Sequence, residues 1–90
     1  MEVEHQKENF RFVLDLGEGF EAELNYFLKG QTLIISHTGV PSMFRGNGYA
    51  EKLTAFALDF ARKNGYKVQP QCSYAVHYFA KNPSEKDLLG

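Results

Sequence analysis

A short glycine-containing run could bind phosphate. Residues 45–48 read Arg-Gly-Asn-Gly and lie between an apolar, β-branched stretch at 33–35 and a stretch with helical periodicity. Glycines let a backbone come close to a ligand, and the first turn of a helix leaves about four N–H groups without partners. With the Arg45 guanidinium, these groups could bind a pyrophosphate. A strand-to-helix connection whose glycines only ease the turn is the alternative, because short glycine motifs are weak evidence.

Two further side chains could take part in proton transfer or nucleophilic chemistry. His37 shortly precedes the glycine run, and a neutral imidazole can accept a proton from an ammonium group. Its alternative role is structural, with a hydrogen bond to a carbonyl at a strand end. Cys72 could accept an acyl group, donate a proton to a leaving thiolate, or serve as a small buried apolar side chain.

The composition excludes some classes of protein. Ninety residues, 43% of them apolar, can bury one core, so we expect one domain over residues 1–90 with an ordered core over about 9–82. The net charge of −1 argues against a nucleic-acid binder. Residues 26–90 nevertheless carry eight Lys and Arg against four acidic residues, which favours a small anionic ligand near the glycine run.

The cysteine count and the hydropathy indicate where the protein acts. Cys72 is the single cysteine and cannot form an internal disulfide, and no segment has the pattern of a signal peptide. No apolar run approaches the roughly 18 residues that span a bilayer. We therefore expect a cytoplasmic protein, monomeric or weakly dimeric, with no membrane partner, no nucleic-acid partner and no metal site.

Hydrophobic periodicity predicts an antiparallel meander before the glycine run. Alternating apolar residues predict strands over 10–16 and 20–26, joined by the Gly-Glu-Gly turn at 17–19. A hairpin turn at 29–30 leads into a third strand over 32–38. This strand is apolar on both faces, so we expect it to lie centrally in the sheet.

The rest of the chain predicts a crossover unit. Apolar residues recur at three- and four-residue steps over 46–64, which predicts an amphipathic helix. A short strand over 66–71 follows, parallel to the preceding strand through a right-handed crossover, and then a helix over 73–81. The fold class is therefore α/β (α+β), and one sheet edge collects His37, the glycine run and Cys72.

Both ends of the chain are polar. The segment 1–9 and the tail after Pro83 are expected to be loosely held, with Leu88 and Leu89 able to dock on the core. His5, in the first of these segments, is expected to face solvent.

Two sequence blocks resemble a known family. They are His-Thr-Gly-Val-Pro at 37–41, followed by the glycine run, and Pro-Gln-Cys-Ser-Tyr at 70–74. Together they resemble the small single-domain relatives of the GCN5-related N-acetyltransferases, which lack the usual N-terminal helices and final strands. The resemblance extends from Tyr26 to Leu89. It implies a truncated fold of that family, with an antiparallel meander, a β-α-β crossover and a C-terminal helix.

The resemblance implies acetyl-CoA as the acyl donor. The family's pyrophosphate-binding loop, Q/R-x-x-G-x-G/A, maps onto residues 43–48, with Met43 where the family has Gln or Arg. The strand at 38–40 would pair with the pantetheine arm and direct one N–H at the thioester carbonyl, and Gly39 beside Pro41 is consistent with a β-bulge. The cofactor-binding residues expected on this basis are Thr38, Val40, Arg45, Gly46, Asn47, Gly48, Tyr49, Ala50 and Ser73.

The resemblance is incomplete where catalysis is concerned. Many of these enzymes have Asn-x-x-Ala-x-x-x-Tyr on the last helix, and the Tyr protonates the departing CoA thiolate. Aligned on Ala75, this chain has Cys72 for the Asn and Phe79 for the Tyr, so the usual acid is missing. Tyr78 is one residue away, about 100° around the helix, and is either a substitute acid or a core residue. The candidate catalytic residues are therefore His37, Cys72 and Tyr78.

The predicted function is direct transfer of an acetyl group from acetyl-CoA to an amine of unknown identity, either a small molecule or a protein. The alternative is a CoA-binding module without turnover, in which Cys72 is a regulatory or redox thiol. A protein-interaction domain without a cofactor is disfavoured, because it leaves the glycine run unexplained.

Overall fold

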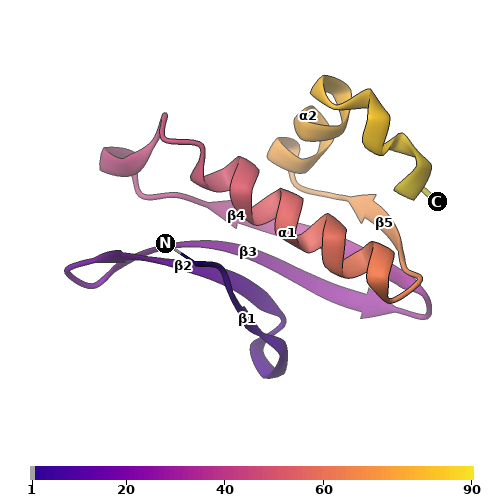
Figure 1. Cartoon of the computed structure of the whole chain (residues 1–90), viewed down its shortest axis with the longest axis horizontal. Coiled ribbons are helices and arrows are strands. Elements are labelled where there is room, and N and C mark those ends of the chain that lie inside the picture. The colour runs from indigo at the N-terminus through magenta and orange to yellow at the C-terminus, as the bar shows by residue number, and fades with distance from the viewer. Residues whose placement is uncertain (1) are drawn as a thin grey trace.

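The computed structural model describes residues 2–90 and contains a five-stranded sheet whose strand order follows the chain (Figure 1). The first four strands are antiparallel neighbours, and the fifth is parallel to the fourth. The predicted α/β fold, with a meander, a crossover and a last helix, is confirmed. The strands are β1 (Glu4–Gln6), β2 (Arg11–Gly17), β3 (Phe20–Lys29), β4 (Thr32–Gly39) and β5 (Lys67–Pro70).

Helix α1 (Tyr49–Lys63) connects β4 to β5, and α2 (Ser73–Lys81) follows β5. The predicted start of the first helix at residue 46 is wrong. Gly46 and Gly48 have φ of 86° and 77°, in the left-handed region, so the backbone becomes helical only at Tyr49. The described residues also form three short 3-10 turns: η1 (Lys7–Asn9), η2 (Ser42–Phe44) and η3 (Pro83–Leu88). Within residues 2–90, neither α1 nor α2 is long and apolar enough to cross a membrane.

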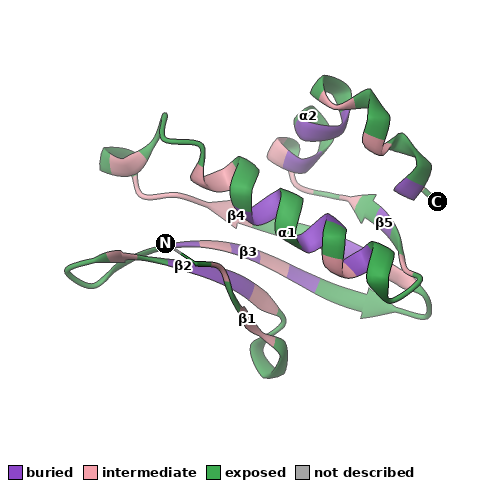
Figure 2. Ribbon diagram, in the orientation of Figure 1, coloured by how far each residue is buried: buried purple, intermediate pink, exposed green. Residues whose placement is uncertain are grey.

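The core lies between the sheet and α1, which packs on β2, β3, β4 and β5. Leu53, Ala57 and Ala61 follow each other at four-residue steps and form the buried stripe of α1, seen in purple in Figure 2. Phe12 of β2 and Leu24 of β3 are fully buried beneath them. Each such large apolar side chain contributes about 1.5–3 kcal/mol on burial.

A β-bulge in β4 determines which side chains face the helices. Ile35 and His37 lie opposite consecutive residues of β3, so Ser36 is the extra residue. Thr38 lies opposite a fully buried residue of β3 and therefore shares the helix-covered face, whereas His37 lies on the other face. The bulge expected at Gly39 is thus wrong in position, because Gly39 is paired with β3.

The first residues of the chain are held in place, contrary to the expectation for 1–9. Strand β1 pairs with β2, and the His5 ring stacks on Phe12 with centroids 4.1 Å apart. The Nε2 atom of His5 lies 2.6 Å from the Tyr26 hydroxyl. Burial, with a smaller effect of the Lys7 charge, lowers the pKa of His5 from its ordinary value of 6.5. The prediction that His5 faces solvent is therefore wrong.

The last residues are also held in place. The Arg62 guanidinium of α1 bonds Glu85 at 2.5 Å and Asp87 at 2.6 Å. Leu88 is buried, and Leu89 forms a parallel bridge with β5, so the docking of these two leucines is confirmed. The prediction that the tail after Pro83 is loosely held is wrong. Both β1 and η3 are regular elements outside the ordered core that was expected over about 9–82.

Candidate functional site

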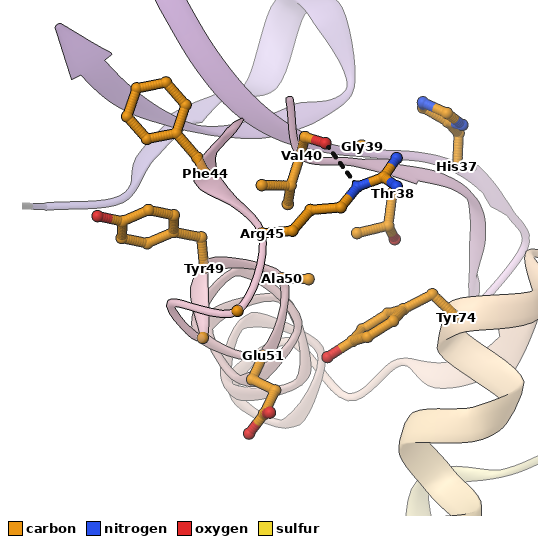
Figure 3. Close-up of a pocket in the computed structure, with 12 residues that line it drawn as sticks. His37, Thr38, Gly39, Val40, Phe44, Arg45, Tyr49, Ala50, Glu51 and Tyr74 are labelled. Atoms are coloured by element: carbon orange, nitrogen blue, oxygen red, sulfur yellow. Dashed lines mark hydrogen bonds between the residues drawn. The ribbon is translucent and has the colours of Figure 1, made fainter. Parts of the chain in front are cut away.

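A cavity of about 490 Å³ opens beside the C-terminal end of β4 (Figure 3). Its walls are the end of β4, the turn that leads into α1 together with the first residues of that helix, and one side chain from α2. The predicted cofactor-binding residues that line it are Thr38, Val40, Arg45, Gly46, Gly48, Tyr49 and Ala50.

One wall of the cavity is an unpaired strand edge. Strand β5 ends at Pro70, opposite Ile35, and the N–H groups of Gln71 and Cys72 both donate to the Ile35 carbonyl, at 2.9 and 3.2 Å. Beyond this point, residues 36–39 have β3 on one side and no strand on the other. Such an edge can bind an extended chain through backbone hydrogen bonds.

At the opposite end of the cavity, the glycine turn leads into the start of α1. Gly46 and Gly48 have positive φ, and a Cβ on either would meet nothing within 4 Å, so the backbone conformation rather than lack of space requires glycine. Helix α1 begins at Gly48 without a side-chain cap, which leaves the N–H groups of its first turn free of side-chain acceptors. The exposed Arg45 donates from Nε to the Val40 carbonyl at 3.3 Å, which holds its guanidinium over the same cavity.

Two of the predicted cofactor-binding residues do not line the cavity. The Asn47 side chain donates from Nδ2 to the Phe44 carbonyl at 2.8 Å and so stabilises the turn. Ser73 is the exposed first residue of α2. Direct contact of these two side chains with a cofactor stays a prediction.

His37 lies at the rim of the cavity and is directed away from its interior. Figure 3 shows the imidazole on the opposite side of β4 from Thr38 and Tyr74. The ring packs against Gly39, where a Cβ would lie 3.0 Å from Nε2. His37 is exposed and open to a molecule that approaches from the sheet face without helices.

The other two candidate catalytic residues have structural contacts. The Cys72 sulfur accepts the Ala75 N–H at 3.4 Å, which caps α2, and lies 3.5 Å from Thr38 Oγ1. Tyr78 is 8% exposed and lines a separate cavity of about 230 Å³, and burial raises the pKa of its phenol. The structure therefore does not bring His37, Cys72 and Tyr78 together around one point.

Sequence reasoning missed two residues of the cavity, Tyr74 and Glu51. The Tyr74 ring extends from α2 into the cavity, with its hydroxyl on the side of Glu51 in the first turn of α1 (Figure 3). Burial, and then the Glu51 charge, raise the pKa of Tyr74 to about 12. Both residues also line the smaller cavity, so they separate the two. The signal available in the sequence was the block at 70–74, which ends in Tyr74.

Comparison with known proteins gives consistent results. The sequence model of a family described as GCN5-related N-acetyltransferase matches residues 11–88. The chain is 35% identical over 83 residues to protein NATD1 of Homo sapiens, a match that covers 90% of this chain and 74% of that protein. It is 34% identical over 85 residues to protein NATD1 of Gallus gallus, with coverages of 92% and 77%. The NMR solution structure of a GCN5-like protein from Staphylococcus aureus matches with a TM-score of 0.77 and 33% identity, over 99% of this chain and 87% of that one.

Proposed function

Because this chain belongs to the GCN5-related N-acetyltransferase family, we propose that it transfers an acetyl group from acetyl-CoA to an amine. The observation that carries the proposal is the pairing of two features in one cavity. An unpaired strand edge at residues 36–39 lies at one side, and the glycine turn at the start of α1 lies at the other. The first suits an extended amide-containing arm and the second suits a pyrophosphate.

The glycine turn would hold the pyrophosphate mainly through the backbone. The open space next to Gly46 and Gly48 allows a phosphate to approach the amide groups, and Arg45 adds a charged donor. Met43 provides no polar group at the position where the family has Gln or Arg, and it is 69% exposed. The amide groups do not depend on that side chain, so their role survives the change.

The free edge of β4 would bind the pantetheine arm. Residues 38–40 line the cavity and have no strand partner on that side, so their backbone groups are available to the two amides of the arm. One N–H of this edge would also stabilise the negative charge that develops on the thioester carbonyl oxygen.

The amine acceptor would approach from the sheet face that carries no helices. His37 opens to that face, beside the free edge of β4. A neutral imidazole there can take a proton from the acceptor ammonium and leave a nucleophilic amine. Transfer would be direct, because passing the acetyl group through a cysteine exchanges one thioester for another without a gain in reactivity.

A CoA-binding module without turnover is the second candidate. It is favoured because Phe79 stands where the family has its acidic tyrosine, and because Tyr78 lines the smaller cavity and not the main one. Isothermal titration with CoA tests the binding common to both functions. Turnover of acetyl-CoA with a panel of amines separates them. A protein that fails to bind CoA in the titration contradicts both.

A further inference from the structure

We propose that the Tyr74 hydroxyl donates a hydrogen bond to the thioester sulfur and so stabilises the thiolate that leaves. This inference rests on the proposed function, since it concerns the sulfur of acetyl-CoA. Phe79 occupies the position of the family's tyrosine, and Tyr74, five residues earlier, would make the contact with the leaving sulfur instead.

The position of Tyr74 supports this contact. Strand β4 and helix α2 come together at Thr38 and Cys72, whose side-chain oxygen and sulfur are 3.5 Å apart, and this contact limits the gap between the two elements. Tyr74 follows two residues later, and its ring extends from α2 into the cavity beside the β4 edge (Figure 3). A pantetheine arm that runs along that edge from the glycine turn toward Thr38 therefore passes the Tyr74 ring before it reaches the end of the gap.

The other donors that line the cavity are engaged or directed elsewhere. Arg45 lies at the glycine turn, where it would contact the pyrophosphate, and the Thr38 hydroxyl lies against the Cys72 sulfur. His37 is directed away from the interior of the cavity. The Tyr49 ring extends away from α2, on the same side of the cavity as Phe44 (Figure 3). Among the described residues, Tyr74 is the side chain of α2 that lines this cavity, and its ring extends into it with the hydroxyl on the side of Glu51.

Tyr74 acts as a hydrogen-bond donor and keeps its proton. Its pKa of about 12 exceeds the value of about 8.5 that is typical of a cysteine thiol, so complete transfer of the phenol proton to the thiolate is unfavourable. As the C–S bond breaks, its electron pair passes to sulfur, and the Tyr74 O–H stabilises the resulting charge. The amine proton leaves toward His37 and solvent, and the released thiolate takes a proton from water.

The direct test measures the thiol of bound CoA and does not require turnover. The pH dependence of the NMR shift of the methylene beside the CoA sulfur gives the pKa of the bound thiol. We expect Tyr74→Phe to raise this pKa by about 1–2 units relative to the wild-type complex, because the thiolate loses its donor. Tyr66→Phe, at the far end of α1 before β5, is the matched control and should leave it unchanged. Equal thiol pKa values in wild type and Tyr74→Phe would overturn the inference.

Turnover gives an independent measurement. Tyr74→Phe should lower kcat about 10- to 100-fold while the affinity for CoA in the titration changes little. If the wild-type protein does not bind CoA, both the proposed function and this inference are wrong. If the wild-type protein binds CoA but acetylates no amine, only the proposed turnover is wrong. The pKa of the bound thiol then still tests whether Tyr74 donates to the sulfur. A Tyr74→Phe protein with wild-type kcat contradicts the inference even if the proposed function holds.

Discussion

At the residue scale, the site relies on backbone conformation more than on charged side chains. Arg45 is the one Lys or Arg among the described lining residues, and Glu51 opposes it with a negative charge. The glycine turn and the free edge of β4 instead present peptide groups whose directions the fold determines. Such groups need no reorganisation when a ligand binds, which favours both affinity and stabilisation of charge. In the proposed reaction, side chains act only at the thioester, where His37 and Tyr74 lie on different sides of β4.

Gly39→Ala should impair catalysis without affecting CoA binding. The added Cβ would lie 3.0 Å from His37 Nε2, so the imidazole must shift by a few tenths of an ångström, while the backbone groups of Gly39 that line the cavity stay in place. We expect a several-fold to about 10-fold loss of kcat at unchanged CoA affinity, since misplacing a general base costs part of its contribution. The double variant with His37→Ala should be no slower than His37→Ala alone. If the losses of kcat in the two single variants add up in the double variant, Gly39 does not act through His37.

Cys72→Ser should retain acetyl transfer. Serine is a preferred N-cap residue and can accept the Ala75 N–H that the sulfur now accepts, so α2 should keep its start. With direct transfer, incubation of wild type with acetyl-CoA and no amine should leave the intact mass unchanged. A kinetically competent acetyl adduct on Cys72 that hydroxylamine removes, and that Cys72→Ser loses together with turnover, would contradict the direct route.

At the element scale, the sequence predicted those elements whose pattern is long enough to repeat. Helix α1 carries four turns of apolar periodicity, and β3 carries a regular alternation, so both were found. Strand β1 has three residues, too few to display a period, and is held by ring contacts of His5 that no local pattern encodes. Phe10 was expected inside a strand but has φ of 52° and is 46% exposed, because η1 ends there.

The contacts of β1 predict a pH-dependent stability. The folded-state pKa of His5 is lowered, mainly by burial, so the folded protein binds fewer protons than the unfolded chain. The contribution of neutral His5 to the free energy of unfolding is therefore complete above its ordinary pKa of 6.5. It is lost as the pH falls below that value and through the lower folded-state pKa. Wild-type Tm should drop over this range. The Tm of His5→Gln should drop less over the same range. The Tm of His77→Gln, a control on the exposed face of α2, should change with pH as that of wild type does. Parallel Tm curves for wild type and His5→Gln would contradict this.

At the scale of the whole molecule, the candidate site was predictable in part. The sequence predicted that the glycine run and the residues before it belong to one site, and most of them line the cavity, because those positions lie close together in sequence. Tyr74 and Glu51 reach the cavity only through the packing of α2 beside the start of α1, which is a tertiary contact. The bulge at Ser36, which places His37 and Thr38 on opposite faces, likewise depends on pairing with β3 and has no marker within β4 itself.

Two glycines at opposite ends of α1 test whether CoA binding stabilises the whole fold through the predicted turn. Gly48 and Gly65 have φ of 77° and 72°, and a Cβ at either position meets nothing within 4 Å. Alanine at each should therefore cost a similar amount, about 1–2 kcal/mol, through backbone strain alone. Wild type with CoA at about 100 times its Kd should gain roughly 2.7 kcal/mol, which raises Tm by many degrees in a domain of this size.

Gly65→Ala should show the same rise in Tm from its lowered starting value, because its turn is remote from the cavity. Gly48→Ala should lose most of the rise, because the strained turn relaxes and withdraws the amide groups that contact the pyrophosphate. The comparison separates loss of stability from loss of binding, since both variants carry the same strain. A full CoA-induced rise in Tm for Gly48→Ala would place the pyrophosphate elsewhere on the molecule.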